Sequence, residues 1–481
     1  MSQELWKPIL QGTTAIEKLQ ADKGFDSYSA LHNWSVRNPG EFWSRAWDDN
    51  KLIGKKGSTF FHQGTDFISS QFFPEARLNV AENLLAHGEP DQVAIVSILE
   101  TGVRTEITWA ELRVKVAATA AAMRAEGVVT GDRVVAWVPN ITETIIYALG
   151  ALSIGAVVST ASPDFAPHAV EDRFGQVEPK ILLAVDGYYY NGKYFDCAEK
   201  SAEIEKLLPT LKKSVRISQF DEWIKPFIGS AANYEQLPFD HPGFVLFSSG
   251  TTGKPKCITH SGAGVMLKAQ SELLYQFNIS KGSKVFFFTT CGWMMWNWLT
   301  MALGRGATIV LFDGAPMAPT PTHLFDIAQD EKLDFFGVSA KFIDSAHKEG
   351  LAPAKSHNLS TIKTIASTGS PLSPEGFTYI YESVSPNIHL ASISGGTDIC
   401  GCFMLGLPNL PVYAGQIQGA ALGLDVQIFS EAGQVADIGV KGELVCRNVF
   451  PSVPLYFWDD SGSAKFKSAY FERFADVWTH G

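Results

Sequence analysis

Short apolar runs alternate with segments of helical pattern over most of this chain. Each run has the length of one strand and is bounded by turn residues. The predicted strands cover 133–138, 156–159, 181–185, 244–247, 285–289, 307–312, 334–338, 364–368 and 387–392. The predicted helices cover 108–127, 142–154, 168–177 and 321–330. Alternation of this kind predicts an α/β fold with mostly parallel sheets covered by helices.

The pattern changes near both ends and predicts three units. Residues 1–80 are rich in aromatic side chains and loop-like, so we predict an irregular N-terminal extension. The α/β core is predicted over 81–410. Segments 426–429 and 442–446 resemble antiparallel strands, which predicts a smaller β-rich subdomain over 411–481.

An apolar stretch over 144–161 invites a membrane assignment. It contains Gly150, Gly155 and several hydroxyl residues, and it lacks bulky apolar side chains throughout. It therefore predicts a buried helix followed by a short strand. We expect no membrane insertion.

Composition narrows the choice of partners and location. The chain has 481 residues, 46% of them hydrophobic, and a net charge of −11 from 39 basic and 50 acidic residues. This charge argues against nucleic acid or an anionic membrane as a partner. Six irregularly spaced cysteines suggest a reducing compartment, and Cys400 and Cys402 are better core residues than metal ligands. With no signal peptide evident, we expect a cytoplasmic protein, and the sequence leaves its oligomeric state open.

A donor-rich loop directly follows the predicted strand 244–247. It holds four hydroxyls, two glycines and two lysines between Ser248 and Lys256. Glycines let backbone N–H groups face an anion, and hydroxyl and ammonium groups add further donors. The loop therefore predicts a nucleotide phosphate site rather than a solvated turn. It is not a P-loop, because the glycines are too close together and Pro255 follows Lys254.

Further segments match, in order, the pattern of the adenylate-forming superfamily, which includes acyl-CoA synthetases and luciferases. They are 369–372 (Gly-Ser-Pro-Leu), 394–398 (Ser-Gly-Gly-Thr-Asp), 442–444 (Gly-Glu-Leu) and 470–481. The 369–372 turn alone is ordinary loop material and the 394–398 segment is a stronger match; any one of them could be only a turn, but all of them in order resemble that family. The resemblance implies two mostly parallel sheets, a barrel-like β subdomain, and ATP or AMP, Mg²⁺ and CoA as ligands.

The resemblance also implies residue roles. Lys254 and Lys256, with the loop hydroxyls, would hold the β- and γ-phosphates, Thr397 would contact the α-phosphate, and Asp398 would hold Mg²⁺. Thr397, Lys254 and Lys256 are accordingly the candidate catalytic residues. The candidate ATP-binding residues are Ser248, Ser249, Gly250, Thr251, Thr252, Gly253, Gly369, Ser370, Pro371, Ser394, Gly395, Gly396 and Thr397.

The expected acyl pocket suggests a particular acid. Gly395 stands where the family's acetate-specific members carry a tryptophan, so we expect room for a small acid longer than acetate. The candidate pocket residues are Trp293, Met294, Met295, Asn297, Thr368 and Gly395. Asn297 is a candidate contact for a second carbonyl, and plain core packing is the alternative for the Trp/Met cluster.

Several phrases, including 73–79, 162–165 and 190–193, resemble acetoacetate–CoA ligases. Tyr190 and Lys193 would then contact the nucleotide end of CoA, although a solvated surface lysine fits Lys193 nearly as well. The implied reaction joins a short 3-oxo acid, ATP and CoA, all small-molecule substrates. A ligase for another short acid and a nucleotide-binding domain without turnover remain alternatives.

The family's ribose-binding aspartate, hinge and small C-terminal catalytic domain would follow Gly481. We therefore expect this chain to represent the large N-terminal domain, with impaired turnover in isolation.

Overall fold

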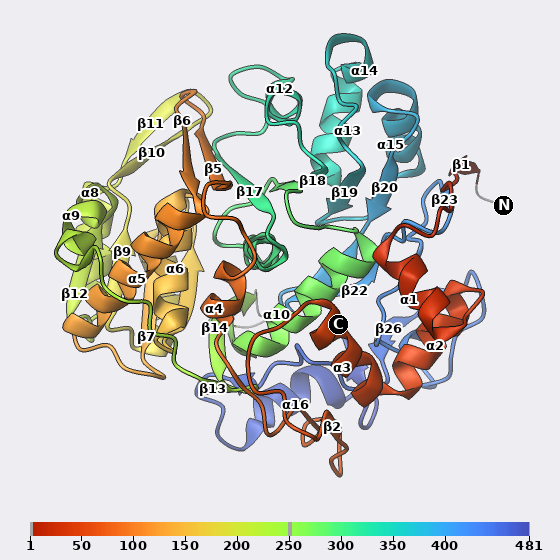
Figure 1. Ribbon diagram of the computed structural model, residues 1–481, viewed down its shortest axis with the longest axis horizontal. Helices are drawn as coiled ribbons and strands as arrows, with labels where there is room; N and C mark the ends of the chain where they lie inside the picture. The colour runs from red at the N-terminus through yellow and green to blue at the C-terminus, as the bar shows by residue number, and fades with distance from the viewer. Residues whose placement is uncertain (1–2, 249–252, 481) are drawn as a thin grey trace.

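Two seven-stranded sheets carry the fold in the computed structural model, which describes residues 3–248 and 253–480 (Figure 1). The first sheet has the order β12 (Lys213–Arg216), β9 (Ile181–Ala184), β7 (Arg133–Trp137), β8 (Val157–Ala161), β14 (Pro242–Ser248), β15 (Lys256–Ser261) and β27 (Tyr456–Phe457). The second has the order β20 (His389–Ser392), β19 (Thr364–Thr368), β18 (Phe335–Ser339), β16 (Lys284–Phe287), β17 (Thr308–Asp313), β5 (Val93–Leu99) and β6 (Arg104–Thr108). Strands β12 to β14 and β20 to β5 pair in parallel, and only β15, β27 and β6 pair antiparallel.

Both faces of each large sheet are buried, which explains the continuous apolar runs. In β7, Val134 belongs to a large apolar cluster that also contains Ile309 of β17, whereas the neighbouring Val135 and Val310 belong to two other clusters. The helices whose buried residues join the shared cluster include α4 (Val80–Leu85), α5 (Trp109–Ala125), α6 (Thr142–Ser153), α10 (Gly262–Ser271) and α11 (Met294–Met301). The outer faces are covered by α7 (Pro167–Phe174) and α8 (Ala198–Leu207) on one sheet and by α12 (His323–Asp330), α13 (Ala340–Lys348) and α15 (Pro374–Tyr379) on the other. The predicted α/β class, with parallel sheets flanked by helices, is confirmed.

Local signals in the sequence determine where α5 and α6 begin and end. Thr108 caps α5 in a capping box with Glu111, as the motif predicts. The apolar stretch 144–161 forms buried α6 and then β8, which confirms the predicted helix and strand. Among the described residues, no helix has both the length and the apolar character needed to cross a bilayer.

The prediction of a loop-like N-terminal extension is wrong for its first half. Helices α1 (Ala15–Lys23), α2 (Tyr28–Arg37) and α3 (Pro39–Asp49) occupy it. Two further short helices, α9 (Phe220–Ile224) and α14 (Pro353–Ser356), lie elsewhere in the chain. Thr14 and Ser27 cap the first two helices through their hydroxyls. In α3 the aromatic side chains face the core, where Phe42 and Trp43 are fully buried. The aromatic richness therefore reflects helix faces docked on the core.

The remaining strands are short and mostly antiparallel. They are β1 (Glu4–Trp6), β2 (Phe61–His62), β3 (Gln71–Phe72), β4 (Arg77–Leu78), β10 (Gly187–Tyr190), β11 (Lys193–Asp196), β13 (Leu237–Pro238), β21 (Ser394–Gly396), β22 (Gly401–Leu405), β23 (Val412–Tyr413), β24 (Gly419–Ala420), β25 (Val426–Phe429), β26 (Glu443–Cys446) and β28 (Trp478–Thr479). Strands β25, β26 and β28 form one antiparallel sheet, which confirms the predicted antiparallel pairing near the C-terminus. Helix α16 (Ala464–Phe471) packs beside it, with Tyr470 stacked on Trp478 at 3.9 Å between ring centroids.

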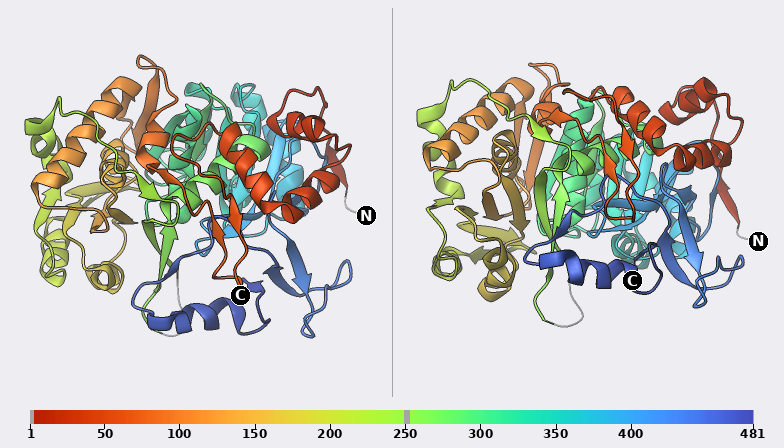
Figure 2. Two further views of the ribbon diagram at one scale, coloured as in Figure 1. Left: turned by 60° about the horizontal axis from the view of Figure 1, so that its bottom comes forward. Right: turned by 90° about the horizontal axis from the view of Figure 1, so that it is seen from below.

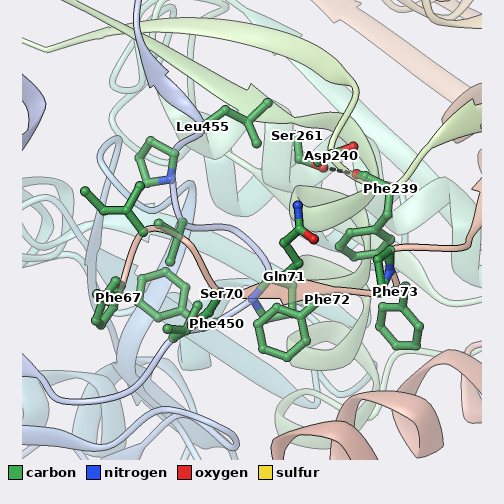
Figure 3. A pocket seen from close by; sticks show the side chains of 16 residues that line it. Phe67, Ser70, Gln71, Phe72, Phe73, Phe239, Asp240, Ser261, Phe450 and Leu455 are labelled. Atoms are coloured by element: carbon green, nitrogen blue, oxygen red, sulfur yellow. Dashed lines mark hydrogen bonds between the residues drawn. The ribbon is translucent and has the colours of Figure 1, made fainter. Parts of the chain in front are cut away.

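The end of the N-terminal extension runs along the C-terminal part of the chain (Figure 2). Phe67 packs against Phe450 and Phe471 there. A cavity of about 140 Å³ lies between these segments and is lined largely by aromatic and apolar side chains (Figure 3). On its far side Ser261 donates a hydrogen bond to the carbonyl of Phe239. This cavity shares no lining residue with the candidate site below.

Candidate active site

A larger cavity of about 500 Å³ lies at the carboxyl ends of β19 and β20. Ligands of open α/β sheets bind at such strand ends. The cavity is lined by Trp293, Met294, Met295, Thr368, Gly369, Ser370, Pro371, Leu372, Phe377, Ser392, Ile393, Ser394, Gly395, Gly396, Thr397, Gly401, Cys402, Gly415, Gln416 and Ile417. The predicted 369–372 turn and 394–397 segment thus share one cavity with most of the predicted acyl-pocket residues.

The predicted phosphate loop, residues 248–256, joins β14 to β15, two antiparallel strands in which Ser248 pairs with Lys256. A P-loop instead joins a strand to a helix, so the structure agrees with the spacing argument against one. Ser248 Oγ is buried and has no hydrogen-bond partner within the described part of the chain. Gly253 and Lys254 are exposed, and Gly253 has φ of +102°, a backbone conformation that favours glycine. The predicted ligands Ser249, Gly250, Thr251 and Thr252 lie outside the described residues.

The phosphate loop and the 394–398 segment meet at Lys256 and Asp398. Lys256 Nζ lies 3.8 Å from Asp398 Oδ1, and Tyr470 donates its hydroxyl to that same oxygen. The ammonium of Lys256 also lies 5.1 Å from the centroid of the Tyr470 ring. Burial and the neighbouring Asp398 raise the pKa of Tyr470 well above its usual value, so its hydroxyl stays protonated as a donor. A lysine at the start of β15 and a carboxylate of the 394–398 segment are therefore held together.

A buried histidine supports the backbone next to Asp398. His260 Nε2 donates to the carbonyl oxygen of Thr397 over 3.0 Å. Burial lowers the pKa of His260 to about 4, so the ring is neutral at pH 7. His480 also packs here, 3.2 Å from where a Cβ on Gly396 would lie, and burial lowers its pKa too. The sequence indicates no role for His260 or Tyr470, because neither lies in a local pattern that predicts a contact with 397–398.

The acyl side of the cavity has an exposed rim and a buried wall. Trp293 is 66% exposed, which excludes plain core packing for this residue, whereas Met294 and Met295 are buried. Asn297 is not among the lining residues; it is 2% exposed on α11, and its Oδ1 has no hydrogen-bond partner among residues 3–248 and 253–480. The structure therefore gives no support to the predicted contact between Asn297 and a second carbonyl.

Gly395 lines the cavity, but close strand pairing explains why it is glycine. A Cβ at this position would lie 2.1 Å from the carbonyl oxygen of Gly401 and 2.8 Å from Cα of Cys402. Both atoms belong to the backbone of β22, which pairs with β21. A larger side chain at 395 would push these strands apart before it filled the cavity. The missing indole is thus not, by itself, the explanation of pocket size in this chain.

We therefore expect Gly395→Ala to separate β21 from β22 and lower the free energy of unfolding by about 1–3 kcal/mol, the cost of an overpacked contact. Urea unfolding measures this change. Gly253→Ala is the matched control, because no atom of the described residues lies within 4 Å of a Cβ there, although its positive φ adds some backbone strain. A Gly395→Ala protein as stable as the parent would contradict the close approach.

A buried ion pair lies directly behind the cavity wall. Lys268 and Glu272, 1% and 2% exposed, contact each other on α10 and its continuation. Glu272 accepts from the backbone N–H of Cys402 at 2.9 Å and from the indole of Trp298 at 2.8 Å. Lys268 donates to the carbonyl oxygen of Cys402 over 2.9 Å. The pair therefore anchors the β22 segment that lines the cavity, and no motif in the sequence indicated it.

The two candidate CoA contacts lie on a separate hairpin, formed by β10 and β11. Tyr190 and Lys193 are exposed and directly opposite each other in its register. They line neither the 500 Å³ cavity nor the aromatic one. The structure brings both residues together at the hairpin tip.

The comparison with protein families agrees with this arrangement. A family model described as "AMP-binding enzyme" matches residues 85–452. A second model, described as "Acetyl-coenzyme A synthetase N-terminus", matches residues 28–84 and so includes helices α2 and α3. The α/β sheets and the strand-end cavity thus belong to an AMP-binding enzyme.

More specific relatives match almost the whole chain. The acetoacetyl-coenzyme A synthetase of Rhizobium meliloti (strain 1021) is 46% identical over 477 residues, which cover 95% of this chain and 72% of that protein. The acetoacetyl-CoA synthetase of Mus musculus is 38% identical and covers 100% of this chain and 75% of the relative. The solved structure of acetoacetyl-CoA synthetase from Streptomyces lividans is 37% identical and matches with a TM-score of 0.95 over 100% of this chain and 78% of that one. The chain belongs to the acetoacetyl-CoA synthetase family.

Proposed function

We propose that this site activates acetoacetate with ATP and transfers the acyl group to CoA. In the first step an oxygen of the carboxylate bonds to the α-phosphorus of ATP, and the bond to the bridging oxygen breaks, releasing pyrophosphate. In the second step the CoA sulfur bonds to the acyl carbon of the adenylate, the bond to AMP breaks, and the thiol proton passes to solvent. The observation that carries the proposal is the meeting of Lys256 with Asp398 beside the cavity that Thr397 lines.

The protein's part in this chemistry is positioning and charge stabilisation. Lys254 and Lys256 would attract the β- and γ-phosphates, and Thr397 would contact the α-phosphate. The turn that begins at Gly369, whose φ of +88° favours glycine, would lie against the adenine. The hydrogen bond from His260 to Thr397 would keep this part of the site in place during the first step.

The residues present fit a magnesium ion that is bound chiefly through the nucleotide. Within the described ranges no three His, Cys, Asp or Glu side chains group closely enough to hold a metal ion on their own. Mg²⁺ is commonly bound by one or two carboxylates together with substrate phosphates. Asp398 would supply that carboxylate, and the ion would neutralise phosphate charge. Tyr470 and Lys256 orient the Asp398 carboxylate.

Acid-dependent exchange of labelled pyrophosphate into ATP tests the substrate assignment, because it reports adenylate formation without CoA. Since we expect impaired turnover from residues 1–481 alone, this and the other activities are measured on protein that also includes the small C-terminal catalytic domain of the family. Acetoacetate and butyrate form the sharpest pair, since both have four carbons and differ in the 3-oxo group. We expect acetoacetate to exceed butyrate and acetate by more than the ~10- to 200-fold that a purely apolar pocket achieves. Equal rates with butyrate would favour a ligase for another short acid. ATP binding without exchange for any acid would favour a nucleotide-binding domain without turnover.

A further inference from the structure

The β10–β11 hairpin is an exposed aromatic ribbon beside the edge of the second sheet (Figure 1). Its exposed aromatic side chains are Tyr189 at 44%, Tyr190 at 47%, Tyr194 at 55% and Phe195 at 38%. A two-stranded hairpin is at best marginally stable alone, so something must hold this one in place. Its turn consists of Asn191 and Gly192, with φ of 52° and 75°, the left-handed pair typical of a tight two-residue turn.

Glu100 holds the tip of this hairpin. Its Oε2 accepts from the backbone N–H of Asn191 at 2.9 Å, and its Oε1 accepts from the N–H of Gly192 at 2.6 Å. A third backbone donor, Ala315 after β17, reaches Oε2 at 2.7 Å. The Glu100 residue is 8% exposed. One carboxylate therefore ties the turn to the ends of β5 and β17.

The negative charge of the Glu100 carboxylate is stabilised by its hydrogen bonds, although the side chain is buried. Burial opposes it, but the three backbone donors outweigh burial and hold the pKa of Glu100 below its usual value. The nearby Asp313 shows the contrast, because burial raises its pKa to about 6. Both carboxylates line a cavity of about 240 Å³ together with Tyr188 and Tyr189 of the hairpin. Glu100 thus remains an ionised anchor beneath the ribbon.

We propose that Glu100 is a positioning residue for the CoA step, because it fixes the turn between Tyr190 and Lys193. This inference rests on the proposed function and on the expectation, from the family resemblance alone, that Tyr190 and Lys193 contact the nucleotide end of CoA. Asn191 and Gly192 are the only residues between them in the chain, so an anchored turn sets the direction of both side chains. The first step of the reaction, at the strand-end cavity, does not involve this hairpin.

The test measures adenylate formation and transfer to CoA separately in the variant Glu100→Gln. This substitution keeps the size of the side chain but removes its charge. We expect pyrophosphate exchange within about twofold of the parent and a KM for CoA about tenfold higher, roughly the value of one charge-assisted contact. Hydrogen exchange at the Asn191 and Gly192 amides should become faster. Glu106→Gln on β6 is the matched control, because Glu106 is exposed and, among residues 3–248 and 253–480, forms an ion pair with Arg104 alone. Equal losses in both steps would show a general structural role and overturn the proposal.

A double-mutant cycle tests whether Glu100 acts through Lys193. If it does, Glu100→Gln should add less than about twofold to the CoA defect of Lys193→Ala, because substitutions that act through the same contact are not additive. Full additivity would overturn the positioning role. CoA affinity measured by calorimetry provides the same comparison without turnover. If the proposed function itself is wrong, the parent protein will form no acetoacetyl-CoA and bind no CoA. If only the present inference is wrong, Glu100→Gln will show faster amide exchange but will bind CoA as tightly as the parent.

Discussion

Replacing Asp398 by asparagine is expected to lower acetoacetate-dependent pyrophosphate exchange by about 10²–10³-fold, the usual cost of losing one preorganised electrostatic group. Asparagine keeps the shape of the side chain and can still accept from Tyr470. It removes the negative charge that lies 3.8 Å from Lys256 Nζ and that would bind the magnesium ion. The loss should therefore fall on the metal-dependent adenylation step. The measurement is the exchange rate over a range of Mg²⁺ concentrations.

Two comparisons make this result specific to Asp398. AMP affinity without Mg²⁺ should remain within a few-fold of the parent, which separates loss of the metal ligand from collapse of the site. Asp425→Asn is the matched control, because Asp425 pairs with Arg447 and does not line the cavity. Exchange by Asp398→Asn within about threefold of the parent would contradict the role as metal ligand, since one charged contact is worth more than that.

The fold was largely readable from local pattern. The apolar run 364–368 matches β19 residue for residue, and the motif at Thr108 marks the start of α5. These features depend on neighbours in the chain and on burial of both sheet faces, which periodicity reports directly. The prediction of an irregular segment over 1–80 is wrong for its first half, because the density of aromatic residues obscures the helix caps at Thr14 and Ser27.

The candidate site was readable only in part. Glycine-rich loops at strand ends indicate a ligand cavity, and residues 369–372 and 394–397 share one. Contacts between distant segments leave no such signal: Tyr470 lies 72 residues after Asp398, and His260 lies 137 residues before Thr397. For Gly395, the sequence shows a small residue but not the strand that approaches it. The local sequence pattern does not show the direction in which a side chain points or which distant segments pack together.

Replacing Lys268 by methionine is expected to lower the free energy of unfolding by about 3–5 kcal/mol, because Glu272 would keep its buried charge without a partner. The two side chains are 1% and 2% exposed, so water cannot take the place of the ammonium. Desolvation makes an uncompensated buried carboxylate costly, even with the N–H groups of Cys402 and Trp298 still donating to it. Urea unfolding at pH 7 measures the loss. The comparison requires that the unfolding free energies of the two proteins fall with urea concentration at the same slope.

The double variant Lys268→Met with Glu272→Gln distinguishes charge from packing. Glutamine removes the buried charge and keeps an oxygen for the N–H of Cys402, so we expect it to restore at least half of the loss. Lys225→Met is the matched control, because Lys225 and Glu222 form an ion pair at 69% and 74% exposure, and such pairs contribute about 0–1 kcal/mol. A Lys268→Met loss no larger than this control would mean that Glu272 takes up a proton or reaches water at little cost. In that case the pair would not anchor the cavity wall at Cys402.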